Sequence, residues 1–283
     1  NELQRDELKL VHYIEEYADN QLVKIFSKQK VNPQNFLADL NDNILSKQIR
    51  PYIEKRLIKC IEILQGNEIP VYRKDLMNNV YESNRIMFIE ETVESVFNFK
   101  RINGELSYFL SIRQDEHEIE LFGKKGIILV NEPCYLVLDN YLYSFQDIDG
   151  KKLLPFFNKE FIQVPHKTEK KFLEGFVKNV IKNYRVHTDG FKIIDKKVHP
   201  IPILSLDTDQ SGQPSFLLMF KYDEETTYYA NKKSELKVLL KEKNGENIFY
   251  RLGRDYLFEN DIIYQLLDLG LKNTAESWFQ PLK

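Results

Sequence analysis

Residues 1–66 carry apolar positions with the period of an α-helix. Within RPYIEKRLIKCIEILQG, Pro51 suits a first helical turn and Gly66 suits a helix end. Between them, apolar residues separated by three or four positions fall on one helical face: Ile53, Leu57, Cys60, Ile61 and Leu64. Upstream, Asn32 is a predicted cap and Pro33 a first helical residue. An earlier amphipathic segment with an acidic outer face carries Leu8, Val11, Ile14 and Tyr17.

From about Ile86 the apolar residues recur at every second position, which indicates strands. Asn103-Gly104 lies between alternating runs and is a strong hairpin signal. One side of the second run carries Leu106, Tyr108, Leu110 and Ile112, and the other carries Ser107, Ser111 and Arg113. The short runs EIELF, IILV, CYLVL and YLYSF follow, separated by turn residues, and predict an antiparallel meander.

The last part of the chain mixes helices and strands. FIQVP reads as a strand, and Thr168 is the predicted cap of a helix running to about Asn183. Further strands are ILSL, FLLMFKY, ELKVLLK and NIFYRL, with Asn244-Gly245 as a second hairpin turn. A final amphipathic helix runs from Asp255 to Leu269 and stops at Gly270.

Because strands and helices are grouped rather than alternating, the predicted fold class is α+β. We expect an N-terminal helical unit (1–66), an antiparallel β-meander (67–150), and a second antiparallel β segment with flanking amphipathic helices (151–283).

Composition supports a globular chain. Of 283 residues, 42% are hydrophobic and 13% aromatic, which is enough to bury a core. Cys60 and Cys134 form no CxxC or Cys/His cluster, which favours reduced thiols in a cytoplasmic protein. No apolar run approaches the roughly 18 residues of a membrane span, so we expect no membrane partner. The chain starts without Met and ends just after a helix, which suggests a piece of a longer protein.

Charge is unevenly distributed. The stretch from Lys151 to Arg185 contains nine basic and three acidic residues, a local net charge of +6, which leaves −9 for the rest of a chain whose net charge is −3. Two interpretations remain open: a solvated face of an amphipathic helix, with Phe172, Phe176 and Tyr184 facing the core, or a surface that binds nucleic-acid phosphates. The candidate cations are Lys151, Lys152, Lys159, Lys167, Lys170, Lys171, Lys178, Lys182 and Arg185. A second, weaker cluster is Arg50, Lys55, Arg56 and Lys59.

Other motifs fail as catalytic or metal sites. DTDQSG, from Asp207 to Gly212, resembles a calcium loop, but its twelfth position is Leu218 rather than Glu. DEHE at 115–118 is not a DExH box, and no GxxxxGK[ST] loop precedes it. Glu235 and Lys237, with Asp207 or Asp223, outline a magnesium nuclease, although the solvent side of a strand is the simpler explanation of the pair. The histidines show no ligand spacing. We expect no catalytic residue, metal or cofactor in this chain.

Three ordered blocks carry a family resemblance: IRPYIEKRLIKCIEIL, NEPCYLVLDNYLYSFQDIDGKKLLPFFNKEFIQVP and GFKIIDKKVHPIPILSLDTDQSGQPSFLLMFKY. Together they resemble the region upstream of the motor in bacterial Swi/Snf-type helicases, ATP-driven double-stranded-DNA translocases of the DEAD/DEAH superfamily. The resemblance runs from about Val31 to the C-terminus.

The resemblance implies a parent ATPase that moves on DNA, with its motor after Lys283. ATP and Mg²⁺ would bind in that motor, whose motifs have no counterpart here. This chain would then be an accessory region that either engages DNA or, alternatively, restrains the motor or contacts a protein through acidic residues of the N-terminal helix: Glu2, Asp6, Glu7, Glu15, Glu16 and Asp19.

Overall fold

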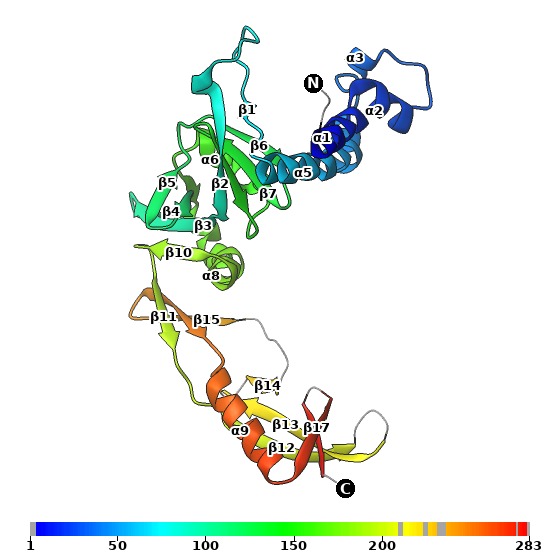
Figure 1. The fold of residues 1–283 in the computed structure, drawn as a ribbon. Coiled ribbons are helices and arrows are strands. Elements are labelled where there is room, and N and C mark those ends of the chain that lie inside the picture. Colours follow the sequence, from blue (N-terminus) through cyan, green and yellow to red (C-terminus); the bar gives the residue numbers. More distant parts are fainter. Residues whose placement is uncertain (1–3, 209–211, 223–225, 231–235, 276, 282–283) are drawn as a thin grey trace. The chain divides into compact units, whose positions relative to one another are not determined.

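The computed structural model describes residues 4–208, 212–222, 226–230, 236–275 and 277–281. Its mixture of helices with mainly antiparallel sheets confirms the α+β class. Two compact units emerge, one formed by Asn1–Asn98 with Ser107–Gln163 and one by Phe99–Leu106 with Val164–Lys283 (Figure 1). The expected boundaries at residues 66 and 150 stay predictions. Within the described residues, no helix is long and apolar enough to cross a membrane.

The first unit opens with helices. These are α1 (Arg5–Glu16), α2 (Asp19–Phe26), α3 (Pro33–Phe36), α4 (Asp42–Ile44), the π-helical turn η1 (Leu45–Ile49) and α5 (Arg50–Gly66). The predicted start of α3 is confirmed, because the Asn32 side chain accepts a hydrogen bond from the Gln34 amide at 3.1 Å. The predicted bounds of α5 are confirmed to within one residue.

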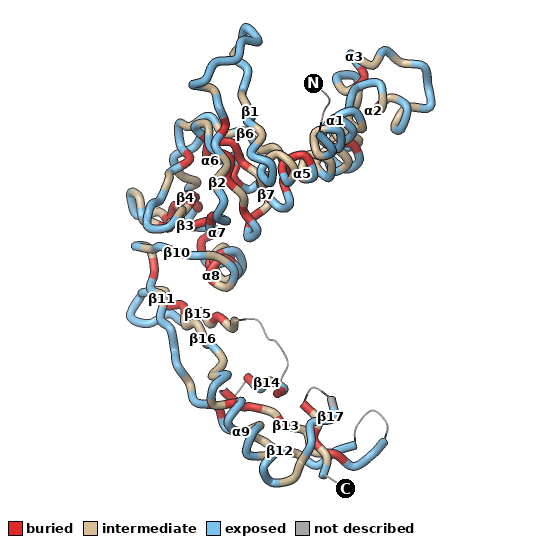
Figure 2. The backbone as a smooth tube through the Cα atoms, in the orientation of Figure 1, coloured by how far each residue is buried: buried red, intermediate tan, exposed pale blue. Residues whose placement is uncertain are grey.

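Helix α5 connects two hydrophobic cores of this unit. Near its start, Ile53 packs against a helical core around Leu22 and Phe36. Toward its end, Leu57 and buried Ile61 pack against the sheet core, which contains Val130, Val137 and Leu142 (Figure 2). A single amphipathic helix therefore fixes the helical segment to the sheet.

The inward face of α1 differs from the predicted one. Leu8, Val11 and Ile14 are 55%, 39% and 44% exposed, so the apolar row faces solvent. Polar contacts orient the helix instead: the Arg56 Nε atom lies 2.6 Å from a carboxylate oxygen of Glu16, and the Tyr52 hydroxyl donates to the Glu16 carbonyl at 3.3 Å. The spacing of apolar residues along the sequence contains no information about these long-range partners.

The sheet of this unit has the order β1-β2-β8-β7-β6. Its strands are β1 (Val71–Tyr72), β2 (Arg85–Thr92), β6 (Gly126–Val130), β7 (Cys134–Leu138) and β8 (Tyr141–Phe145). The antiparallel meander is confirmed for β6, β7 and β8. However, β2 pairs with β8 in parallel, which the sequence did not indicate. The short helices η2 (Glu82–Asn84), η3 (Gly150–Lys152) and α6 (Leu154–Asn158) complete the unit.

A long hairpin joins β3 (Glu94–Ile102) to β4 (Glu105–Gln114). Asn103 and Gly104 both have positive φ, 52° and 83°, which confirms the turn. The serine side of β4 is not exposed, since Ser107 and Ser111 are buried and both faces of the strand are covered. β4 also pairs with β5 (His117–Glu120) and β9 (Ile162–Val164). The residues of the hairpin tip, Phe99–Leu106, are grouped with the second unit.

The second unit begins with a long helix made of α7 (His166–Phe172), a π-helical turn η4 (Leu173–Val177) and α8 (Lys178–Asn183). Next come β10 (Arg185–Thr188) and a sheet of order β11-β16-β15, with bounds Lys192–Lys196, Glu246–Leu252 and Lys237–Lys243. The Asn244-Gly245 hairpin is confirmed. β11 pairs with β16 in parallel, an exception to the predicted antiparallel arrangement.

Another sheet of the second unit has the order β12-β13-β18-β17, with β14 beside β13. The bounds are β12 (Ile201–Thr208), β13 (Pro214–Lys221), β14 (Thr227–Tyr229), β17 (Leu271–Ala275) and β18 (Trp278–Pro281). Helix α9 (Tyr256–Asp268) packs on it through Ile262, Ile263 and Leu266. Gly270, at φ 84°, follows the end of α9 as predicted, and Asp255, expected as the first helical residue, is its cap.

Packing against β6 leaves no room for a side chain at Gly126. A Cβ there would lie 2.3 Å from the Phe157 ring and 3.1 Å from Leu136. We expect Gly126→Ala to lower the free energy of unfolding by about 1–3 kcal/mol, because the core is overpacked.

The matched control is Gly66→Ala at the last residue of α5, where nothing lies within 4 Å of the added methyl group. It should leave stability unchanged or raise it by up to about 1 kcal/mol. Urea denaturation of both variants tests this. Equal effects of the two substitutions on the free energy of unfolding would show that the close packing at Gly126 does not determine stability.

Candidate nucleic-acid interface

The helix running from His166 to Asn183, called the basic helix below, has one buried side. Its buried residues are Glu169, Leu173, Val177, Val180 and Ile181. Thr168 is not its cap: the helix begins two residues earlier, and the Thr168 hydroxyl donates back to the Pro165 carbonyl at 3.0 Å.

The π-helical turn changes which aromatic residues face inward. Phe176 is 36% exposed and stacks on half-buried Phe172, with ring centroids 4.8 Å apart. The prediction that both rings face the core is therefore wrong for Phe176. A π turn inserts an extra residue into the helical repeat and rotates the following side chains, so a row drawn at constant spacing fails across it.

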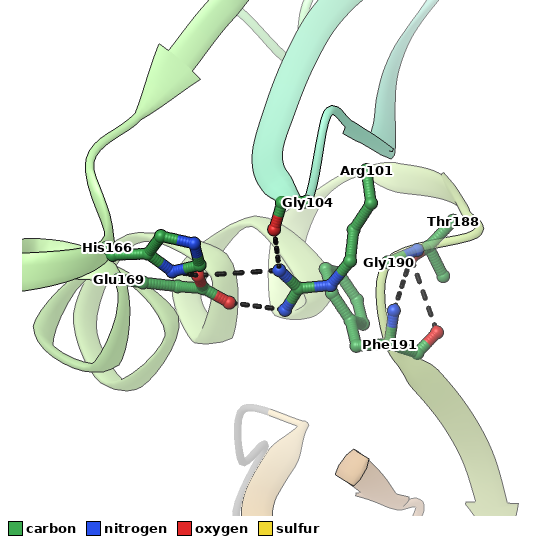
Figure 3. Close-up of polar contacts among 7 residues, drawn as sticks. All are labelled: Arg101, Gly104, His166, Glu169, Thr188, Gly190 and Phe191. Carbon is green, nitrogen blue, oxygen red and sulfur yellow. Dashed lines mark hydrogen bonds and ion pairs between the residues drawn. The ribbon is translucent and has the colours of Figure 1, made fainter.

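A buried carboxylate anchors the basic helix to the tip of the β3–β4 hairpin. Glu169, on α7, accepts from both terminal nitrogens of Arg101, with the Nη1–Oε2 distance at 3.5 Å (Figure 3). The Arg101 Nη1 atom also donates to the Gly104 carbonyl at 3.0 Å, and His166 Nδ1 lies 3.4 Å from Glu169. The Glu169 side chain is only 11% exposed, so its charge requires these partners.

The same hairpin tip is supported by a turn after β10. The Thr188 hydroxyl accepts from the amides of Gly190 and Phe191 at 3.2 and 3.3 Å (Figure 3). Gly190 packs closely here, because an added Cβ would lie 2.7 Å from the Cδ1 atom of Leu106. Phe191 packs between Phe99 and Phe249, with centroid distances of 5.2 and 4.9 Å. The hairpin tip, the turn after β10 and β16 thus pack together.

The nine candidate cations are divided between the two units. Lys167, Lys170, Lys171, Lys178, Lys182 and Arg185 belong to the second unit, whereas Lys151, Lys152 and Lys159 belong to the first. Lys167, Lys170 and Lys171 are exposed, and Lys178 and Lys182 are half-buried. Lys182, Arg185 and Lys152 each have an interaction within the chain. The phosphate-binding role of these residues remains a prediction.

Intramolecular ion pairs engage most of the second basic cluster. Arg50 pairs with Glu54 at 2.6 Å, Arg56 with Glu16 at 2.6 Å, and Lys59 with Glu62 at 2.7 Å. Arg56 also lies over the Tyr52 ring, 3.4 Å from its centroid. Because three of its four charges have carboxylate partners, this cluster offers little net charge to a phosphate backbone.

A buried polar cluster in the second unit was not predicted. Arg254 and Glu259 have side chains 3% exposed and form a bidentate pair, with Arg254 Nε 2.9 Å from Glu259 Oε1. The Tyr222 hydroxyl donates to the same oxygen at 2.6 Å and accepts from the Asp255 amide at 2.6 Å. Burial and the Glu259 carboxylate raise the pKa of Tyr222. With its partners satisfied in this way, the cluster serves to anchor the start of α9.

Neither thiol has the environment of a nucleophile. Cys60 and Cys134 are both buried and unpaired. Burial, together with Asp149, Asp147 and Glu54, raises the pKa of Cys134 to about 12, so its thiol stays protonated at neutral pH.

Three histidines lie beside carboxylates in different parts of the fold, namely His12 with Glu16, His166 with Glu169 and His199 with Asp255. Across the part of the chain that the structure describes, no group of three His, Cys, Asp or Glu side chains could hold a metal ion.

The remaining sequence motifs have simple structural roles or fall outside the described residues. Asp115, at φ 51°, lies in the turn between β4 and β5. The centre of DTDQSG and the nuclease candidates Glu235 and Asp223 lie outside the described residues. Lys237 is half-buried and donates to the Thr226 hydroxyl.

Comparison with protein-family models, curated proteins and solved structures found no significant match to this chain.

Removing the charge of the buried anchor should destabilise the second unit. We expect Glu169→Gln to lower the free energy of unfolding by about 1–3 kcal/mol, because Arg101 loses its charged partner while remaining partly buried. Glu174→Gln, an exposed change on the same helix, is the control and should change stability by less than about 0.5 kcal/mol. Chemical denaturation measures both, and similar values for the two variants would contradict the anchoring role.

Proposed function

We propose that this chain is a non-catalytic accessory region of a Swi/Snf-type ATP-dependent DNA translocase, and that the exposed side of the basic helix assists DNA engagement. The observation that carries the proposal is the charge asymmetry of one helix. Its inward side is apolar apart from the paired Glu169, while Lys167, Lys170 and Lys171 point to solvent. Clustered cations on one element bind phosphates by releasing counterions.

The resemblance of three ordered sequence blocks to the region upstream of such motors supports the class of parent protein. In this proposal, ATP and Mg²⁺ bind in a motor following Lys283, and DNA is reached through the parent protein. The accessory role explains why the candidate catalytic motifs of this chain have ordinary structural explanations where the structure describes them.

Charge reversal tests the DNA role. We expect the combined change of Lys167, Lys170, Lys171 and Lys178 to Glu to weaken duplex-DNA binding. The slope of log K against log salt concentration should fall by about 0.9 for each phosphate that the variant no longer neutralises. Fluorescence anisotropy over a range of salt concentrations measures both quantities.

A matched control changes Lys24, Lys28, Lys30 and Lys47 to Glu. These four exposed lysines lie in the first unit, so the variant carries the same change in net charge at a different surface. Equal reductions of affinity in the two variants would indicate a general charge effect, and an unchanged slope in the first would remove the DNA role.

A second candidate function is restraint of the motor or contact with another protein. The observation that favours it is the exposed apolar row of α1, Leu8, Val11 and Ile14, among acidic residues. Part of the acidic face is already committed, since Asp6 pairs with Lys9 and Glu16 with Arg56. Glu2 lies outside the described residues.

The two candidates predict opposite effects of deleting residues 1–283 from the parent protein. Restraint predicts a higher ATPase rate without DNA, because the deletion removes the inhibitory surface. DNA engagement predicts an unchanged basal rate and a weaker stimulation by DNA. Steady-state ATPase measurements at several DNA concentrations distinguish them. An ATPase unaffected in both respects would argue against either role.

A further inference from the structure

The connection between β1 and β2 forms a closed loop with apolar side chains at its tip. Val71 pairs with Ile86 and Tyr72 with Arg85, and the Arg73 amide donates to the Asn84 carbonyl at 2.9 Å. Beyond these pairs, the loop projects away from the sheet (Figure 1).

One aspartate organises the tip of the loop. A carboxylate oxygen of Asp75 accepts from the amides of Met77 and Asn79, both at 2.8 Å. The Asp75 amide in turn donates to the Asn79 carbonyl at 3.0 Å, and Asn78 has a φ of 63°. These amide hydrogen bonds lower the pKa of Asp75. The tip therefore has a defined conformation, which reduces the entropy lost when it binds.

The loop displays large apolar side chains that its own unit leaves uncovered. Leu76 and Met77 are 105% and 82% exposed, and Val80 and Tyr81 are 51% and 54% exposed (Figure 2). Arg73 and Lys74 precede the tip and are also exposed. Adjacent apolar residues on an ordered loop next to cations fit an apolar cavity with a negative rim.

The same unit contains such a cavity. A space of about 560 Å³ lies between the start of α5, the turn before it and strand β6. Its wall is largely aliphatic and includes Leu45, Ile53, Leu57 and Ile128. The volume is within the range of protein ligand sites and exceeds the size of one side chain.

The polar part of the cavity carries a net negative charge. Its charged residues are Asp42, Arg50 and Glu54. Glu54 is already engaged by Arg50 at 2.6 Å and by the Asn131 side chain at 2.6 Å. Asp42 is exposed, and within the described residues no ion pair joins its carboxylate. The Asp42 carboxylate can therefore form an ion pair with a cation of a segment that binds in the cavity.

From this complementarity we propose that residues 1–283 self-associate, with Leu76 and Met77 of one copy inserting into the α5–β6 cavity of another and Lys74 or Arg73 meeting Asp42. Leu76 is fully exposed in its own chain and so does not fill its own cavity, whereas the cavity of a second copy offers the complementary aliphatic wall beside the exposed Asp42 carboxylate. Loop and cavity are different surfaces, so two copies either exchange loops reciprocally in a two-fold dimer or join head to tail, in which case assembly closes into a ring or continues as an open chain. This inference does not depend on the proposed DNA role.

Sedimentation velocity over increasing concentrations of the full chain, up to about 1 mM, tests the proposal. The wild-type chain should associate. Leu76→Asp with Met77→Asp should weaken association on the order of 30-fold, as for removal of a binding hot spot. The control Leu257→Asp alters a leucine on α9 that is 82% exposed, as Met77 is, and should leave association unchanged.

Two complementation experiments test the pairing itself. Ser46→Trp should block the cavity that Ser46 lines, making that variant monomeric. An equimolar mixture of the loop variant and the cavity variant should still form a one-to-one complex, because one intact loop and one intact cavity remain. Asp42→Lys and Lys74→Asp should each weaken association, and the double variant should restore it.

Circular dichroism and thermal unfolding should be the same for all variants, which excludes loss of folding as the cause. A monomeric wild-type chain at the highest concentration overturns the proposal. A mixture of the loop and cavity variants that stays monomeric also overturns it. A loop variant that loses DNA binding while its association is unchanged overturns it as well, because the loop tip would then contact nucleic acid rather than a second copy.

Discussion

The ion pair between Arg101 and Glu169 determines the orientation of the basic helix. A buried carboxylate must meet a positive partner, and the hairpin tip provides one for Glu169. Once Glu169 points inward, the helical repeat sends Lys167, Lys170 and Lys171 to solvent. The proposed interface thus depends on an acidic residue that binds no ligand itself.

The two basic clusters look alike in sequence but differ in how many of their cations pair with carboxylates. In α5, the cations Arg50, Arg56 and Lys59 each reach a carboxylate, and Arg56 covers an aromatic ring as well. Arg56 holds α1 against α5 through Glu16, and Arg50 also donates to the Ile128 carbonyl of β6 at 3.2 Å, whereas Lys59 pairs within α5. A count of charges along the chain does not distinguish a cation that holds a helix from one that is available to a phosphate.

Two different features of the first unit, α1 and the 73–84 loop, carry exposed apolar side chains. On α1 they result from polar anchors that rotate the helix, and on the 73–84 loop they result from a turn closed by Asp75. Both features expose hydrophobic side chains to solvent, which costs free energy. Each is therefore a candidate interaction surface. The loop has the more defined geometry and a complementary cavity, and it therefore carries the more specific proposal.

Local signals determined a large part of this fold from the sequence alone. The cap Asn32, the turns at Asn103-Gly104 and Asn244-Gly245, and helix α5 lie where the chain predicts them, because each depends on residues within a few positions of each other. Tertiary structure alone decided the parallel pairing of β2 with β8 and of β11 with β16, the inward face of α1, and the exposure of Phe176. The basic character of the candidate interface was visible in the sequence, but its anchor at Arg101 was not, because that partner lies 68 positions away and only packing brings it to Glu169.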